Sequence, residues 1–189
     1  MGNKNHKHKK RECPCCCNCI REEPKKYTLL SYNPEEPKCK IGVLGDSKTG
    51  KTCFCNRLAY NNYNDYYDDT YSVSIISYKT TFKLKEEKVV DIDIELNDNP
   101  SKENMKSLIK LFIRKIQEAI ILYAIDDRNS FEHLQKWVDL VQSVNKEIII
   151  IIIGNKSDRF LFGMVPESEA KEFAIINNFL FLYYLMLIW

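Results

Sequence analysis

Residues 45–52 read Gly45-Asp46-Ser47-Lys48-Thr49-Gly50-Lys51-Thr52 and fit the phosphate-loop pattern G-x-x-x-x-G-K-[ST]. An apolar run at residues 39–44 precedes the stretch and is typical of a buried strand, while residues 53–60 can form a helix. The two glycines let the backbone fold tightly around a phosphate, and the N–H groups of the loop and helix N-terminus then point at the anion. Lys51 can reach the β- and γ-phosphates of a nucleotide, and the Thr52 hydroxyl can ligate Mg²⁺. The pattern alone also fits a chance turn before a helix.

The composition predicts an ordinary globular protein. The chain has 189 residues, of which 44% are hydrophobic and 29% charged, enough for one domain with a real core. The net charge is +2, but residues 1–11 hold five basic residues and no acid, so the remainder is slightly acidic. The basic feature is therefore a tail and not a nucleic-acid-binding face, and no nucleic-acid partner is expected.

The cysteines favour a reducing, cytoplasmic setting. Five of the eight cysteines lie within residues 13–19, whereas a disulfide scaffold spreads its cysteines through a small secreted chain. No apolar core of a signal peptide follows the basic start, and no apolar run reaches the ~18 residues of a membrane span.

Residues 1–37 predict a disordered basic and cysteine-rich tail, and residues 38–189 predict one α/β domain. Apolar runs and alternation predict strands at residues 39–44, 72–84, 88–96, 119–125, 148–153 and 179–189, the last of them a central strand. The strands at 72–84 and 88–96 predict a hairpin, because a charged turn joins them. Helices predicted between the other strands indicate a mostly parallel sheet.

Helical periodicity predicts four helices and their inward faces. Their expected positions are residues 53–60, 101–116, 130–144 and a last helix that Pro166 opens. The inward residues expected are Met105, Leu108, Ile109, Phe112 and Ile116 in the second helix and Phe131, Leu134, Trp137, Val138 and Val141 in the third.

Asn155-Lys156-Ser157-Asp158 follows six consecutive isoleucines, with only Gly154 between them. The carboxyl end of a central parallel strand is where an open α/β sheet places ligand contacts. A carboxylate there can accept from both the N1–H and the 2-amino group of guanine, and adenine offers no such donor pair, so Asp158 would select guanine. Asn155 would brace the loop, and the stem of Lys156 would pack over the base. The tetrapeptide alone also fits a polar turn, but a phosphate loop upstream in the right element order favours the nucleotide interpretation.

The chain resembles a small GTPase of the Ras superfamily, and most of all its Rab branch, over about residues 38–182. Gly45-Asp46-Ser47 followed by Gly50-Lys51-Thr52 resembles the Rab phosphate loop, and Ser130-Phe131 followed by Trp137 resembles the family's helix after the fourth strand. The resemblance implies a P-loop NTPase fold with a mostly parallel six-stranded sheet and helices on both faces. It also implies a guanine-nucleotide switch that binds GTP, GDP and Mg²⁺ and hydrolyses GTP.

The resemblance assigns further roles. Thr70 stands where the family has its switch I threonine, which binds Mg²⁺ and senses the γ-phosphate, although Thr70 also fits a plain loop residue. Tyr63 stands where an aromatic ring flanks the guanine. The implied metal ligands are Thr52, Thr70 and Asp98, and the implied catalytic residues are Lys51, Thr70 and Lys102. The implied nucleotide-binding residues are Gly45, Asp46, Ser47, Lys48, Thr49, Gly50, Lys51, Thr52, Cys53, Tyr63, Thr70, Ser101, Asn155, Lys156 and Asp158.

The second switch departs from the family pattern D-x-x-G-Q-E. The chain has Asp98-Asn99-Pro100-Ser101-Lys102-Glu103. Ser101 replaces the glycine whose N–H contacts the γ-phosphate, and Lys102 replaces the glutamine that orients the attacking water. Because lysine has no acceptor, we expect GTP binding with slow or impaired hydrolysis. The alternative is a pseudo-GTPase that acts as a protein-binding scaffold. An ATP-dependent P-loop kinase is disfavoured by Asp158 and by the lack of a lid-like arginine cluster.

Two other positions depart from the family. Lys48 stands where the family often has glycine. The family's Ser-Ala-Lys loop should follow the last strand, but residues 183–187 are Tyr-Tyr-Leu-Met-Leu, and the last helix of the fold is missing from the sequence. The sequence thus predicts a C-terminally truncated domain with an exposed apolar patch on its sheet.

The N-terminal tail offers a membrane anchor. Gly2 permits myristoylation, although His6 stands where the pattern has Ser or Thr. One acyl chain binds membranes only marginally, and the basic residues and palmitoylation of the cysteines at 13–19 would add to it. The C-x₂-C spacing of Cys13, Cys16 and Cys19 also fits metal ligands, but the lack of a second ligand pair at zinc-finger distance disfavours a folded zinc module, and a plain disordered tail is the further alternative. We therefore expect a cytoplasmic protein, on the cytosolic face of membranes if acylated, whose switch regions bind effectors and regulators in vesicle traffic or signalling.

Overall fold

The fold is seen in a computed structural model, which describes residues 38–62, 74–83, 89–99 and 106–183. The predicted tail, including its acylation and C-x₂-C positions, lies outside these ranges, as do the hairpin turn and residues 184–189.

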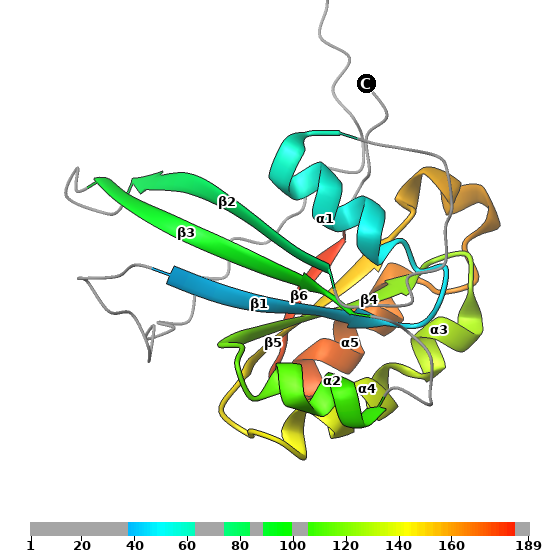
Figure 1. The fold of residues 1–189 in the computed structure, drawn as a ribbon. Coiled ribbons are helices and arrows are strands. Elements are labelled where there is room, and N and C mark those ends of the chain that lie inside the picture. The colour runs from blue at the N-terminus through cyan, green and yellow to red at the C-terminus, as the bar shows by residue number, and fades with distance from the viewer. Residues whose placement is uncertain (1–37, 63–73, 84–88, 100–105, 184–189) are drawn as a thin grey trace, which may run out of the picture. The chain divides into compact units, whose positions relative to one another are not determined.

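Six strands form one sheet in the order β2-β3-β1-β4-β5-β6 (Figure 1). Their bounds are β1 Lys38–Gly45, β2 Ser74–Lys83, β3 Val89–Asp98, β4 Glu118–Ala124, β5 Ile149–Asn155 and β6 Leu180–Tyr183. Strands β2 and β3 pair antiparallel, and all other neighbours pair parallel. The predicted hairpin and mostly parallel sheet are confirmed. The prediction of a central last strand is wrong, because β6 pairs only with β5 within the described sheet.

Strand β3 continues through Asn97 and Asp98, past the predicted end at residue 96. Both residues pair on two sides, with Gly42 and Val43 of β1 and with the first two residues of β2. Pairing from two neighbours holds these polar residues in the strand although they break its apolar alternation. Asp98 therefore lies at the carboxyl end of β3, beside the end of β1.

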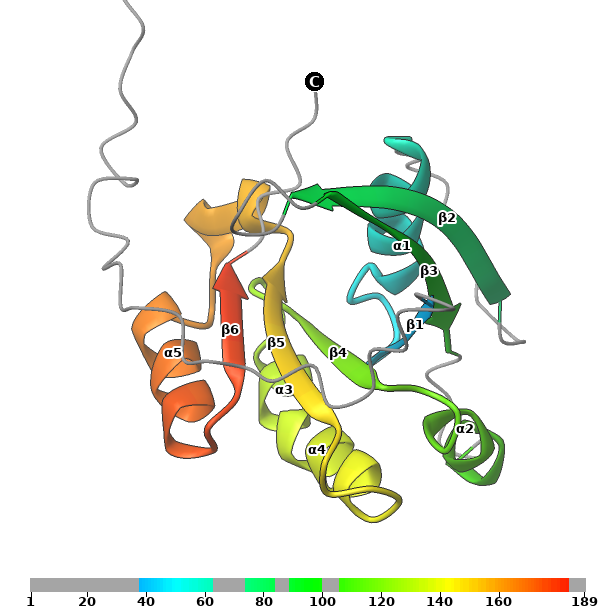
Figure 2. The ribbon, with the colours of Figure 1, turned by 90° about the vertical axis from the view of Figure 1, so that its left-hand side faces the viewer.

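Helices cover both faces of the sheet (Figure 2), as the sequence predicts. Helix α1 (Lys51–Tyr60) packs on one face through Phe54 and Cys55. The other face carries α2 (Lys106–Ile113), the short α3 (Arg128–Glu132), α4 (Leu134–Gln142) and α5 (Glu167–Ile176). A 3₁₀ helix, η2 (Ser157–Phe162), follows β5.

The single helix predicted at residues 130–144 is wrong, because the chain turns at His133 between α3 and α4. Asp127 accepts from the backbone N–H groups of Asn129 and Ser130 and so caps the start of α3. His133 has φ −80° and ψ −5°, outside the ideal helix, and α4 starts after it. The predicted inward residues of this segment are nevertheless buried or half-buried.

The predicted helices at residues 101–116 and after Pro166 also need correction. The helix predicted at residues 101–116 ends at Ile113 in the described structure, and Ile116 is buried in the loop that follows. Leu108, predicted to face inward, is 38% exposed, because the buried stripe runs through Ile109 and Ile113. Pro166 is not the first helical residue but the N-cap of α5, with an extended backbone (ψ 139°).

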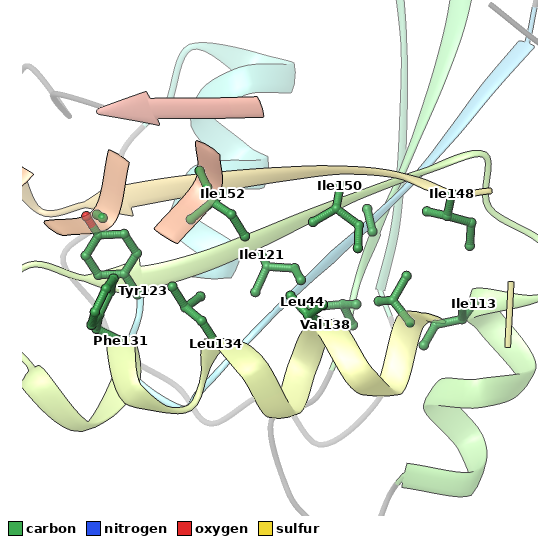
Figure 3. Packing of buried hydrophobic residues seen from close by; sticks show 14 of the residues in the cluster. Leu44, Ile113, Ile121, Tyr123, Phe131, Leu134, Val138, Ile148, Ile150 and Ile152 are labelled. Atoms are coloured by element: carbon green, nitrogen blue, oxygen red, sulfur yellow. The ribbon is translucent and has the colours of Figure 1, made fainter. Parts of the chain in front are cut away.

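The larger core lies between the sheet and α4 (Figure 3). Ile150 and Ile152 of β5 point to this side together with Ile121 of β4, while Ile153 joins the smaller core under α1. The isoleucine strand and β4 are thus buried on both faces, as predicted. On the α1 side Leu182 of β6 is 56% exposed. None of the helices in the described ranges has the length and apolarity to cross a bilayer.

Candidate functional site

The loop between β1 and α1 has a backbone that only certain residues accept. Gly45 has φ +135°, and a Cβ there would collide with the carbonyl oxygen of Leu122 in β4. Gly50 has φ +88°, and a Cβ there would lie 2.5 Å from Nδ2 of Asn155. Lys48 has φ +64°, a left-handed conformation that costs a residue with a Cβ about 1–2 kcal/mol. The two glycines of the motif are therefore required sterically, whereas Lys48 is strained.

Asp46 organises the inside of this loop. Its carbonyl oxygen accepts hydrogen bonds from Lys51 Nζ at 2.8 Å and from the Thr49 hydroxyl at 2.9 Å. Thr49 is fully buried and Lys51 is only 5% exposed. The lysine side chain thus folds back over its own loop.

The start of α1 is suited to an anion. Its N-cap is Gly50, which brings no capping side chain, and its first turn holds no acidic residue. The positive end of the helix dipole and the first N–H groups therefore face the loop. Burial lowers the pKa of Lys51 to about 8, although Asp98 and Asp46 oppose this shift. A buried ammonium at a helix N-terminus is a setting that phosphate oxygens stabilise.

Thr52 and Asp98 come together from α1 and β3. The Thr52 hydroxyl donates to Oδ2 of Asp98 at 2.6 Å. Asp98 is fully buried, and its Oδ1 has no hydrogen-bond partner among the described residues. Burial raises the pKa of Asp98, while the Thr52 hydrogen bond and Lys51 lower it. A hydroxyl beside a buried, half-satisfied carboxylate is an oxygen donor set of the kind that Mg²⁺ prefers.

The N-K-x-D loop reaches the phosphate loop through Asn155. This residue ends β5, is fully buried, and donates from Nδ2 to the carbonyl oxygen of Thr49 at 2.7 Å. The geometry agrees with the bracing role predicted for Asn155, whose Oδ1 has no partner in the part of the chain that the structure describes. Lys156 follows with φ +63°, and Asp158 is exposed in the first turn of η2.

The family model described as "Ras family" matches residues 40–184 of this chain. The chain belongs to the Ras family of small GTPases. It is also similar to "Ras-related protein RGP1" of Oryza sativa subsp. japonica, with 29% identity over 144 residues, which cover 76% of this chain and 62% of that protein. The chain thus spans about 62% of the length of this curated relative. The α/β P-loop fold and the small-GTPase resemblance are confirmed.

The Ras family implies a guanine nucleotide and Mg²⁺, and the described residues of this chain fit both groups. The buried ammonium of Lys51 and the uncapped N-terminus of α1 suit phosphates. The unpartnered Asp98 Oδ1 beside the Thr52 hydroxyl suits Mg²⁺. When bound, Mg²⁺ neutralises charge on the β- and γ-phosphate oxygens.

Several predicted site residues lie outside the described ranges: Tyr63, Thr70, Ser101 and Lys102. Their roles in this Ras-family chain remain predictions. Within the described ranges, Ser47 and Lys48 are exposed on the loop, and Cys53 is half-buried in the first turn of α1.

The structure adds Asp126, which the sequence interpretation missed. Its Oδ1 lies 3.5 Å from Nζ of Lys156, and its Oδ2 accepts from Nη1 of Arg159 at 3.0 Å. Asp126 thereby positions the lysine predicted to pack over the base. The carboxyl-end rule for parallel strands would have found it, because Asp126 closely follows β4 as Asp158 follows β5. His133 and Trp137, which contact Asp46, have no such signal in the sequence.

We expect Lys48→Gly to stabilise the nucleotide-free protein by about 0.5–1 kcal/mol. Glycine adopts φ +64° without a Cβ clash, and its extra freedom in the unfolded chain offsets part of the gain. The measurement is urea unfolding. Lys48→Ala is the matched control: it removes the charge but keeps the Cβ, and its free energy of unfolding should stay within about 0.5 kcal/mol of wild type. An equal gain in the free energy of unfolding of both variants would assign the effect to the lost charge and contradict the proposed backbone strain at Lys48.

Proposed function

We propose that this protein is a guanine-nucleotide-binding switch that holds GTP and hydrolyses it slowly. The observation that carries the proposal is the 2.7 Å hydrogen bond from Asn155 to the Thr49 carbonyl. It joins the loop that would recognise the base to the loop that would hold the phosphates. The bond supports assigning the two short motifs, whose bonded residues lie 106 positions apart, to one site.

Each described residue has a chemical task in this proposal. Lys51 neutralises the β- and γ-phosphates, and the N–H groups at the start of α1 donate to them. Thr52 and Asp98 hold Mg²⁺. Asp158 accepts from the guanine edge, and Lys156, positioned by Asp126, packs over the base.

The switch itself rests on residues that precede β2 and follow β3. We propose that Thr70 senses the γ-phosphate and that the two segments change when GTP replaces GDP. Effectors and regulators would then bind these two segments. The Rab-like phosphate loop supports a role in vesicle traffic or signalling.

We expect Asp158→Ala to weaken GTP binding by about 10- to 100-fold, because two hydrogen bonds to a charged acceptor are lost. Wild type should also prefer GTP over ITP, which lacks the 2-amino group, and the variant should lose this preference. Fluorescent GDP and GTP binding in Mg²⁺, with ITP and ATP as competitors, measures both effects.

Glu147→Ala is the control for this variant. Glu147 is an exposed acid at the opposite end of β5, so its loss should leave every affinity unchanged. Competition by ATP as strong as by GTP would contradict guanine selection. Absence of any nucleotide binding by wild type would overturn the switch and leave the scaffold as the better function, which the altered second switch favours.

Slow hydrolysis rests on the second switch. Lysine at position 102 has no acceptor with which to orient water, and serine at position 101 restricts a backbone that glycine leaves free. The long cationic side chain of Lys102 can neutralise the γ-phosphate instead. The site would therefore favour GTP retention over turnover.

The expected single-turnover rate of wild type is at least tenfold below the roughly 4 × 10⁻⁴ s⁻¹ intrinsic rate of Ras. Lys102→Gln restores an acceptor for the attacking water and should raise the rate, whereas Lys102→Ala should not. Radiolabelled GTP preloaded on the purified protein gives the rates. A wild-type rate equal to that of Ras would contradict the proposal.

We further propose that the N-terminal tail anchors the protein to the cytosolic face of membranes through an acyl chain on Gly2, its basic residues and the cysteines at 13–19. The expected result is incorporation of a labelled myristoyl analogue in cells and its loss in Gly2→Ala. Equal labelling of both proteins, or no labelling of wild type, would refute acylation at Gly2.

A further inference from the structure

Asp46 is held from outside the phosphate loop as well as from within it. It directly follows β1, and its side chain is 25% exposed between the loop and α4. Oδ1 accepts from the indole Nε1–H of Trp137 at 2.8 Å. Oδ2 lies 2.6 Å from Nδ1 of His133, and because a carboxylate oxygen only accepts, the imidazole donates from Nδ1.

The two donors come from one short segment far away in the sequence. His133 precedes α4 and Trp137 lies in its first turn, four residues later, so both side chains fall on one side of the helix. They lie 87 and 91 residues from Asp46. Helix α4 is itself fixed to the sheet through Leu134, Val138 and Val141 of the core. The segment therefore gives the loop a rigid support.

The inner face of Asp46 transmits this support to the phosphate-binding residues. The same residue that α4 holds by its carboxylate holds Lys51 and Thr49 by its carbonyl oxygen. The loop also contains Lys48 in a strained conformation, which tends to relax unless neighbouring contacts fix the backbone. An external support at Asp46 opposes that relaxation.

We propose that His133 and Trp137 are positioning residues, which hold the phosphate loop in its nucleotide-binding conformation through the carboxylate of Asp46. We call these three residues the Asp46 clamp. The inference rests on the proposed nucleotide binding. In the Asp46 clamp neither His133 nor Trp137 touches the nucleotide. Both act by keeping the Asp46 carbonyl, and with it Lys51, in place. Loosening the clamp should speed nucleotide release.

The test measures the dissociation rate of fluorescent GDP from the full-length protein in Mg²⁺. Trp137→Phe removes one donor but keeps an aromatic ring in the core, and it should raise the rate about three- to tenfold, the factor that one hydrogen bond represents. His133→Ala should act similarly, and Asp46→Ala more strongly. Gln135→Ala is the matched control, because it removes a 2.8 Å hydrogen bond to Asp139 on the exposed side of α4 and should leave the rate unchanged.

Two comparisons separate positioning from a general loss of structure. Because His133 acts only through Asp46, the double variant His133→Ala with Asp46→Ala should release GDP no faster than Asp46→Ala alone. Asp46→Asn keeps an acceptor for Trp137 and an amide that can pair with the other imidazole tautomer, so it should raise the release rate less than Asp46→Ala does. Circular dichroism and thermal melting of each variant verify that it is folded.

Additive effects of the two alanine substitutions, or wild-type rates in folded Trp137→Phe and His133→Ala, would overturn the clamp while leaving nucleotide binding intact. Failure of wild type to bind GDP would overturn the proposed function and the clamp together. If Trp137→Phe does not fold, the His133 and Asp46 variants still decide the question, because His133 is 39% exposed and outside the core.

Discussion

The carbonyl oxygen and the carboxylate of Asp46 hold the phosphate loop from two sides, and the rest of the site depends on that constraint. The carbonyl oxygen accepts hydrogen bonds from Lys51 and Thr49, and the carboxylate accepts hydrogen bonds from His133 and Trp137. A loop with three left-handed or positive-φ residues has little conformational preference for one shape on its own. Contacts to the sheet through β1 and to α4 through Asp46 supply that preference, so the core of the domain determines the geometry of the loop.

Parallel pairing explains why the remaining groups converge. Strands β1, β3, β4 and β5 end at one edge of the sheet, and each is followed or closed by a polar residue of the site. Asp98 closes β3, Asn155 closes β5, and Asp126 follows β4 closely. Strands β4 and β5 are mainly buried and apolar, and the polar residues of the site lie where the strands end, where they pair with one another across elements. Asn155 bonding to Thr49 and Lys156 bonding to Asp126 are such pairs.

Burial sets the electrostatics of the phosphate site. Lys51 and Asp98 are both almost inaccessible to solvent. Burial lowers the pKa of Lys51 and raises the pKa of Asp98, since it disfavours the charged form of each, while the attraction between the two opposes both shifts. Phosphates and Mg²⁺ would complete the charge balance by adding anions beside the ammonium and a cation beside the carboxylate. The departures at Lys48 and Lys102 each add a positive charge to one of the two motifs expected to contact phosphate.

The sequence by itself determined the fold class, the hairpin, the parallel core strands and the two motifs, because apolar periodicity and glycine-rich turns are local signals. It did not determine the break at His133, the inward stripe of α2, the edge position of β6 or the clamp on Asp46. The clamp depends on which helix faces which loop after the sheet is assembled, and its contacts, between residues 87 and 91 positions apart, leave no local pattern. The edge position of β6 depends on the order of the strands in the assembled sheet. Only the tertiary structure decided that His133, just before α4, and Trp137, in α4, hydrogen-bond to the phosphate loop.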